Sequence, residues 1–281
     1  MQTRILNRVK GLLRLFYQSN LVIFKQEKNP EALTDTQKSF VVWNSKRLGI
    51  SQEESQKRYL SSWSSINKGH SGSAYRLFCD LSYNLFNVFY SDIGDELYEA
   101  YERHSHMHFL RMLSYTEPQW SDKDLVIQHL HKYSNIDIID YGCGLAQKSR
   151  SIANYMKNKG KVVRLFLVDI PTIRKEFLLW LGEQSGIETK FYDFTINSPI
   201  PKLPSCNICI ATEFFEHVID PLKYFEEMHS ALRKDGLLIT NTSDHKKEFM
   251  HVTPNLQPLR NKIQDLKYDI IIENEILRKT S

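Results

Sequence analysis

The sequence predicts an α/β fold: a doubly wound, mostly parallel sheet with helices on both faces, preceded by a helical N-terminal region. Two observations support this prediction. After Ser121, short apolar runs alternate with segments of helical periodicity, which is the pattern of successive βαβ units. Before Ser121, strand patterns are scarce. Residues 52–63 and 95–113 are typical of helices, and the second segment has an acidic first turn and apolar positions such as Leu97, Tyr101 and Phe109. We therefore expect a helical region over residues 1–120 and an α/β domain over residues 121–281.

Each expected strand is a short run rich in apolar or β-branched residues. The runs span residues 136–141, 162–169, 188–194, 206–212, 236–242 and 268–277. Helical spacing follows four of these runs, beginning near Ala146, Ile173, Pro221 and Pro254. Because only four residues follow Leu277, we expect six strands, or a seventh strand supplied from elsewhere.

Charge is distributed unevenly along the chain. The formal net charge is +4, yet residues 1–26 hold five basic side chains and no acidic one, so the remainder is close to neutral. Proteins that bind nucleic acid normally spread Lys and Arg along a whole face, and the near-neutral body disfavours such a partner. Ile5, Val9 and Leu12 recur at helical spacing near the basic residues, which fits either a helix packed on its own protein or peripheral contact with a membrane surface.

Four cysteines are too few and too scattered for a disulfide scaffold in a chain of this length. A reducing, cytoplasmic setting is therefore expected. Cys206 and Cys209 form a C-x-x-C pair inside an apolar run, and the sequence offers no second pair to complete a zinc site. We interpret both as ordinary strand residues. No apolar run reaches the roughly 20 residues that cross a bilayer.

Doubly wound sheets bind ligands in the loops beyond the carboxyl ends of their strands. The first such loop contains Gly142 and Gly144, which let the backbone turn tightly and approach a ligand. With Asp140 ahead of them, the D-x-G-C-G sequence resembles the glycine-rich motif of class I S-adenosylmethionine-dependent methyltransferases, which have a Rossmann-like fold. The resemblance implies that Asp140 supports the amino-acid moiety of the cofactor and that Gly142, Cys143 and Gly144 pass against it. Ala146 replaces the family's third glycine.

Two further carboxylates follow expected strands. By the same resemblance, Asp169 binds the two ribose hydroxyls, and Asp193 accepts from the adenine amino group beside Phe194, which covers the purine ring. The alternatives are a helix cap for Asp169 and a turn for Asp193. A dinucleotide-binding protein would also use Asp169, but Asp140 before the glycines and the missing third glycine favour a methyltransferase.

The segment after the fourth expected strand is the most informative. It closely resembles the E-x-x-E-H segment of ubiquinone-biosynthesis O-methyltransferases. If a helical turn forms here, Glu213, Glu216 and His217 share one face, and the resemblance implies a divalent-metal site with His245 or His251 as a further ligand. Glu213 is also assigned to the cofactor. The alternative is a metal-free site in which Glu216 lies near the cofactor and His217 or His245 is the general base.

These resemblances imply a methyltransferase with S-adenosyl-L-methionine as cofactor and Mg²⁺ or Mn²⁺ as a candidate metal. We expect O-methylation of a small polar molecule, such as a sugar of a surface polysaccharide or a natural-product intermediate, with the N-terminal region as a lid over the acceptor pocket. The alternatives are a metal-dependent RNA 2′-O-methyltransferase, disfavoured by the near-neutral body, and a non-catalytic, cofactor-binding partner subunit. Assembly as a homodimer is compatible with the sequence.

Overall fold

The computed structural model describes residues 33–67, 109, 112–113, 120, 122–194, 200–245 and 251–280. The chain divides into two compact units: Met1–Leu77 with Leu110–Thr116, and Phe78–Phe109 with Glu117–Ser281. The basic helix expected near the N-terminus lies outside the described residues, as does most of the helix expected over 95–113. The division expected at residue 121 stays a prediction.

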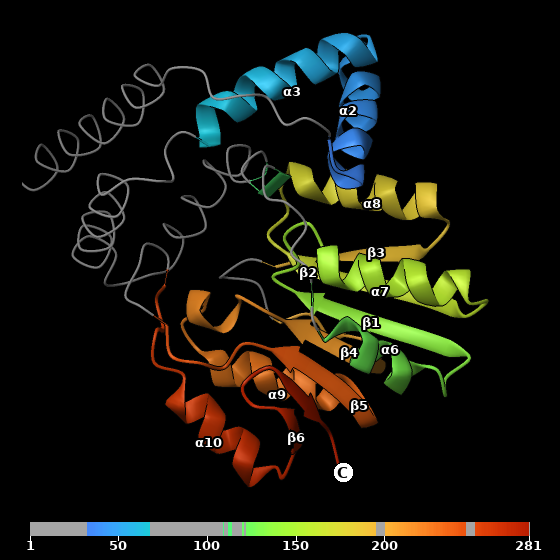
Figure 1. The fold of residues 1–281 in the computed structure, drawn as a ribbon. Helices are drawn as coiled ribbons and strands as arrows, with labels where there is room; N and C mark the ends of the chain where they lie inside the picture. Colours follow the sequence, from blue (N-terminus) through green and yellow to red (C-terminus); the bar gives the residue numbers. More distant parts are fainter. Residues whose placement is uncertain are drawn as a thin grey trace, which may run out of the picture. The chain divides into compact units, whose positions relative to one another are not determined.

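The first unit contains two described helices, α2 (Asp35–Leu48) and α3 (Gln52–Asn67) (Figure 1). Thr34 begins α2 with a capping box, in which its hydroxyl accepts from the Gln37 backbone N–H and the Gln37 side chain accepts from the Thr34 N–H. Gly49 ends α2 with a φ of 63°, a left-handed conformation that glycine adopts without a Cβ clash. Over the described residues 33–67, the helical character expected of the N-terminal region is confirmed.

The second unit is built around a seven-stranded sheet in the order β3-β2-β1-β4-β5-β7-β6 (Figure 1). The strands are β1 (Asn135–Tyr141), β2 (Val162–Asp169), β3 (Glu188–Asp193), β4 (Cys206–Ala211), β5 (Leu232–Thr240), β6 (Asp269–Ile272) and β7 (Ile276–Arg278). Strands β1 to β5 pair in parallel, whereas β7 runs antiparallel to both of its neighbours. This confirms the mostly parallel, Rossmann-like sheet expected from the sequence.

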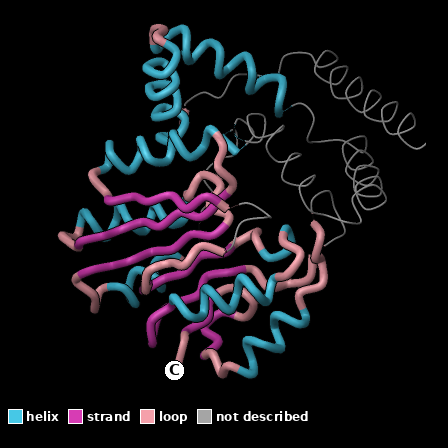
Figure 2. Tube along the Cα trace, turned by 180° about the vertical axis from the view of Figure 1, so that it is seen from behind, coloured by secondary structure: helices cyan, strands magenta, loops and turns pink. Residues whose placement is uncertain are grey.

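Helices cover both faces of this sheet (Figures 1 and 2). They are α6 (Lys123–Leu130) before β1, α7 (Gln147–Asn158) after β1, α8 (Ile173–Ser185) after β2, α9 (Pro221–Ala231) after β4 and α10 (Gln257–Asp265) after β5. The strand order reverses between β1 and β4, so right-handed crossovers place α7 and α8 on one face and α9 on the other. Doubly wound sheets bind ligands at such a reversal, beyond the carboxyl ends of the strands. Among the helices with a described position, none is long and apolar enough to span a bilayer.

The expectation of six strands is wrong, because the run at residues 268–277 folds back on itself as β6 and β7. Asn274 occupies the turn with a φ of 60°, and the Glu275 N–H donates to the Ile272 carbonyl at 3.1 Å. Asparagine enters this left-handed conformation more readily than most residues. Strand β7 then lies between β5 and β6, which completes a seven-stranded sheet from this chain alone.

A buried carboxylate joins four adjacent strands at their amino ends. Asp137 on β1 is 1% exposed and accepts from Arg164 on β2 at 2.6 and 3.0 Å and from Arg233 on β5 at 2.8 Å. Asn207 on β4 accepts from the Asp137 N–H at 2.9 Å and from Arg233 at 3.0 Å. These bonds fix the edge of the sheet opposite to the carboxyl ends of the parallel strands.

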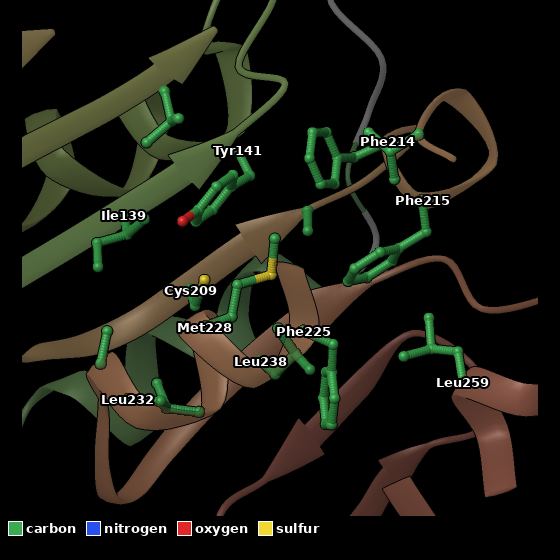
Figure 3. Close-up of a cluster of buried hydrophobic side chains, with 14 of the residues drawn as sticks. Ile139, Tyr141, Cys209, Phe214, Phe215, Phe225, Met228, Leu232, Leu238 and Leu259 are labelled. Carbon is green, nitrogen blue, oxygen red and sulfur yellow. The ribbon is translucent and has the colours of Figure 1, made fainter. Parts of the chain in front are cut away.

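A hydrophobic cluster packs α9 and α10 against the sheet (Figure 3). Phe225 and Met228 of α9 lie beside Cys209 of β4 and Leu238 of β5 (Figure 3). Cys206 and Cys209 are both fully buried within β4, where they serve as apolar strand residues, as the sequence indicates.

Candidate active site

A cavity of about 910 Å³ lies at the reversal of strand order, beyond the carboxyl ends of β1, β4 and β5. Its lining includes Gly142 and Cys143 after β1, Glu213 after β4, and His245 and His251 after β5. The topology therefore brings the glycine-rich loop and the acid–histidine segment, which are far apart in sequence, to one cavity.

The backbone of the glycine-rich loop adopts left-handed conformations that residues with a Cβ disfavour. Gly142 and Gly144 have φ values of 59° and 54°. A Cβ on Gly142 would lie 2.8 Å from the ring of Phe214, so this position has no room for a side chain. Ala146, which replaces the family's third glycine, also has a positive φ of 51° at the start of α7. Alanine adopts this left-handed conformation at a cost of about 1–2 kcal/mol.

Asp140 lines the cavity at the end of β1, and its carboxylate is hydrogen-bonded to Ser149 on α7. The Ser149 hydroxyl donates to Asp140 Oδ2 at 2.5 Å. Burial raises the pKa of Asp140 to about 7 against the opposing effect of this hydrogen bond, and the nearby Asp169 carboxylate adds to the rise. A cationic group bound beside it would favour the ionised form.

Asp169, at the end of β2, fixes the glycine-rich loop. Its Oδ2 accepts from the Gly144 N–H at 2.8 Å, and its Oδ1 accepts from the Ile170 N–H at 2.7 Å and from Arg174 at 3.2 Å. The side chains of Asp169 and Arg174 are only 11% and 8% exposed. Thr172, rather than Asp169, caps α8. The role of Asp169 toward ribose hydroxyls stays a prediction.

Asp193 and Phe194 follow β3 in two different environments. Asp193 is half exposed and accepts from Lys175 on α8 at 2.7 and 2.9 Å. Phe194 is buried and packs edge-on against Phe214 and Tyr224, with ring centroids 6.3 and 5.4 Å apart. Within the described residues neither side chain lines the cavity, and their contacts with adenine stay predictions.

The single helical turn expected across Glu213 to His217 does not form. Glu213 has a φ of 53°, and a short 3₁₀ turn covers only Phe215–His217. Glu213 instead accepts from the Asn241 side chain at 3.0 Å. Burial acts to raise the pKa of Glu213, but this hydrogen bond together with His245 and His217 lowers it below its ordinary value.

Glu216 and three histidines come together beside Glu213, and we call Glu216, His217, His245 and His251 the Glu–His cluster. His245 Nδ1 and His217 Nε2 lie 3.6 and 3.8 Å from Glu216 Oε1. The His251 ring packs edge-on against both His217 and His245, with centroids 4.9 and 5.4 Å apart. One ligand atom from each of Glu216, His245 and His251 lies within 4.8 Å of the others, as in a metal site.

Glu216 is the buried centre of this cluster. It is 0% exposed, and within the described structure neither of its carboxylate oxygens accepts a hydrogen bond. Burial raises its pKa to about 8, and the neighbouring Glu213 carboxylate adds to the rise. A buried carboxylate is stable in its ionised form only beside a cation. Two histidines and one carboxylate are a donor set for divalent transition metals.

Residues 132–265 match the family model described as a methyltransferase domain. The match covers just under half of the chain and assigns these residues to a methyltransferase domain. The enzyme class expected from the sequence is confirmed, whereas the ubiquinone branch stays a prediction. A search among curated proteins finds no match.

Solved structures with similarity to this chain include three proteins of low sequence identity. A methyltransferase from Aquifex aeolicus is 13% identical over 57% of this chain and 90% of its own, with a TM-score of 0.42. Coclaurine N-methyltransferase bound to N-methylheliamine and SAH is 20% identical over 42% of this chain and 33% of its own, with a TM-score of 0.34. The [4+2]-cyclase SpnF is 16% identical over 42% and 43%, also with a TM-score of 0.34. The chain thus spans less than half of the latter two.

Several residues that support the methyltransferase site have no motif that reveals them. Ser149 holds Asp140, Arg174 holds Asp169, and Asn241 holds Glu213. Their only sequence signal is position, since Ser149 and Arg174 lie in the first turns of helices and Asn241 directly follows β5. Which acid each one contacts depends on the tertiary fold.

Proposed function

We propose that this chain transfers the methyl group of S-adenosylmethionine to a hydroxyl oxygen of a small polar molecule, such as a sugar of a surface polysaccharide or a natural-product intermediate. One observation carries the proposal. His245 and His251 of the Glu–His cluster line the same cavity as Gly142 and Cys143 of the glycine-rich loop. The groups suited to the cofactor and those suited to the acceptor therefore face one space.

The protein needs only to position the acceptor and to remove one proton. S-adenosylmethionine supplies an electrophilic methyl group, so catalysis rests on holding the acceptor oxygen in line with it and on excluding water. His245 is the proposed base, because it lines the cavity and a neutral imidazole accepts a proton near pH 7. Glu216 Oε1 lies 3.6 Å from His245 Nδ1, next to the imidazole that would take the proton.

The Glu–His cluster also fits a divalent cation such as Mn²⁺ or Mg²⁺. Glu216 offers buried carboxylate oxygens that accept no hydrogen bond in the described structure, and His245 and His251 offer ring nitrogens. A cation bound there would lower the pKa of the acceptor hydroxyl. Glu213 and His217, the other ligands implied by the sequence resemblance, lie next to this group, with His217 Nε2 at 3.8 Å from Glu216.

Methyl transfer from radiolabelled cofactor to a panel of sugars and phenols tests the proposal. If the cluster holds a metal, turnover should fall in EDTA and return with Mn²⁺, while the affinity for the cofactor, measured by calorimetry, stays nearly unchanged. If His245 acts as the base without a metal, EDTA should leave turnover unchanged. His245→Ala should lower turnover by roughly 10²–10⁴-fold, as for a lost general base. His129→Ala is the matched control, since His129 lies on α6, bonds to the Asp235 carbonyl and does not line the cavity.

The outcomes separate the parts of the proposal. Full turnover in EDTA excludes the metal, and full turnover of His245→Ala excludes this base. If amines are methylated and none of the hydroxyl acceptors is, O-methylation is refuted. Efficient methylation of an RNA 2′-hydroxyl would favour the nucleic-acid alternative.

A further inference from the structure

The two histidines that follow β5 are carried by irregular backbone. His245 lies in the loop after β5, and His251 begins the segment that leads to α10; neither lies in a helix or a strand. Such a backbone has no ladder of its own hydrogen bonds, so other groups must fix the geometry of the side chains it carries.

Arg260 on α10 makes three hydrogen bonds to the loop after β5. Its Nη1 donates to the Thr242 carbonyl at 2.6 Å and to Asp244 Oδ1 at 2.9 Å, and its Nη2 donates to Asp244 Oδ2 at 3.1 Å. This two-pronged contact fixes both the place and the orientation of the carboxylate. Asp244 is the residue directly before His245, so the contact sets the backbone from which the His245 side chain projects.

Further bonds join the two histidine segments. Asp244 Oδ1 also accepts from the Leu256 N–H at 2.9 Å, and the His245 N–H donates to the Pro254 carbonyl at 2.8 Å. The loop after β5 and the segment before α10 are therefore tied to each other on both sides of His245.

Thr253 connects this assembly to Glu216. Its N–H donates to the Glu216 carbonyl at 3.0 Å, and its hydroxyl donates to the Val218 carbonyl at 2.7 Å. Hydrogen bonds and the intervening peptide links thus connect Arg260 through Asp244 to His245, and from there through Pro254 and Thr253 to the backbone carbonyl of Glu216.

We propose that Arg260 and Asp244 form a positioning pair that sets His245 against Glu216; the proposal rests on the function proposed for the Glu–His cluster. The two side chains are 20% and 56% exposed. An ion pair with this exposure contributes little to stability. Its effect is therefore geometric, and Arg260 acts on the reaction through His245 without touching the acceptor.

The full-length Arg260→Gln variant tests this role. Turnover should fall by about 10–100-fold, as for other groups that orient an active-site ligand, while cofactor affinity and melting temperature stay close to those of the wild type. Arg278→Gln is the matched control. It removes another exposed Arg–Asp pair, with Asp269 on the β6–β7 hairpin, and should leave turnover unchanged.

A double-mutant cycle separates positioning from a general loss of charge. If the two residues act as a pair, Asp244→Asn should lower turnover to a similar extent, and the double variant should be no more than about twofold worse than either single one. Arg260→Lys keeps the charge but not the planar fork, so it should restore turnover only in part. Multiplicative losses in the double variant would overturn the pairing.

The remaining outcomes are also decisive. If Arg260→Gln has a much lower melting temperature than the Arg278→Gln control, its loss of turnover has a structural cause. Asp244→Asn, which keeps the shape of the side chain, then tests the positioning role in its place. If the wild type is active and both Asp244→Asn and Arg260→Gln turn over as fast as it does, the positioning role is overturned. If the wild type methylates no acceptor, the proposed function fails. The affinity for Mn²⁺, measured by electron paramagnetic resonance, then tests the positioning role by itself. A fall in affinity of about 10–100-fold in Arg260→Gln supports the role, and equal affinities in variant and wild type overturn it.

Discussion

Replacing Glu216 with glutamine should stabilise the metal-free protein at neutral and alkaline pH. The folded protein holds the Glu216 proton up to a pKa of about 8, whereas the ordinary value is 4.5. Between these values the unfolded chain binds fewer protons than the folded one, so stability falls as the pH rises. Glutamine is neutral at every pH, and the variant should not show this fall.

The magnitude follows from the same two values. Each pH unit within the window lowers the free energy of unfolding by about 1.4 kcal/mol, which reaches about 3 kcal/mol at pH 7. Glu216 is fully buried, so solvent does not screen the effect. For a domain of this size, about 3 kcal/mol corresponds to a difference in melting temperature of roughly 6–12 °C.

Urea unfolding in EDTA between pH 4.5 and pH 9 measures the effect. The two proteins should be nearly equally stable at the lowest pH, diverge up to about pH 8 and stay a constant distance apart above it. Glu273→Gln, which changes an exposed carboxylate in the β6–β7 turn, should keep the wild-type slope. A difference between wild type and Glu216→Gln that does not depend on pH would refute the reasoning.

Two further predictions concern the cofactor edge. Gly142→Ala should lower the free energy of unfolding by about 2–4 kcal/mol, because a positive φ and contact with the Phe214 ring both penalise a Cβ. Gly49→Ala, with a φ of 63° and open space around it, should lose only the backbone part in the same denaturation assay. Asp169→Ala should weaken cofactor binding by roughly 10–100-fold in calorimetry, because charged hydrogen bonds are lost. Undiminished binding would remove Asp169 from the site.

The parallel part of the sheet could be predicted from the sequence because buried strands read as apolar runs. The run at 162–169 coincides with β2, and the one at 188–194 with β3 extended by Phe194. The C-terminal hairpin could not be predicted in the same way. Asn274 lies between two glutamates in a run that is otherwise mostly apolar. Local pattern alone does not distinguish a turn there from the polar face of one long strand.

Sequence motifs predict only part of the candidate site. The E-x-x-E-H spacing singled out Glu216 and His217, but the expected helical turn fails because Glu213 takes a left-handed conformation and bonds to Asn241 instead. His245 was one of two options for a further ligand. Its approach to Glu216, together with His251, depends on contacts between loops that are distant in sequence, which no local spacing encodes.

The Asp137 network at the amino ends of the strands has a consequence for how this domain can change. Arg164, Arg233 and Asn207 hold β2, β1, β4 and β5 together without using any residue that lines the cavity. Insertions or exchanges in the loops after β4 and β5 leave this cross-link intact. New acceptor preferences can therefore be selected, in nature or in a loop library, on a sheet whose register is secured from the other end.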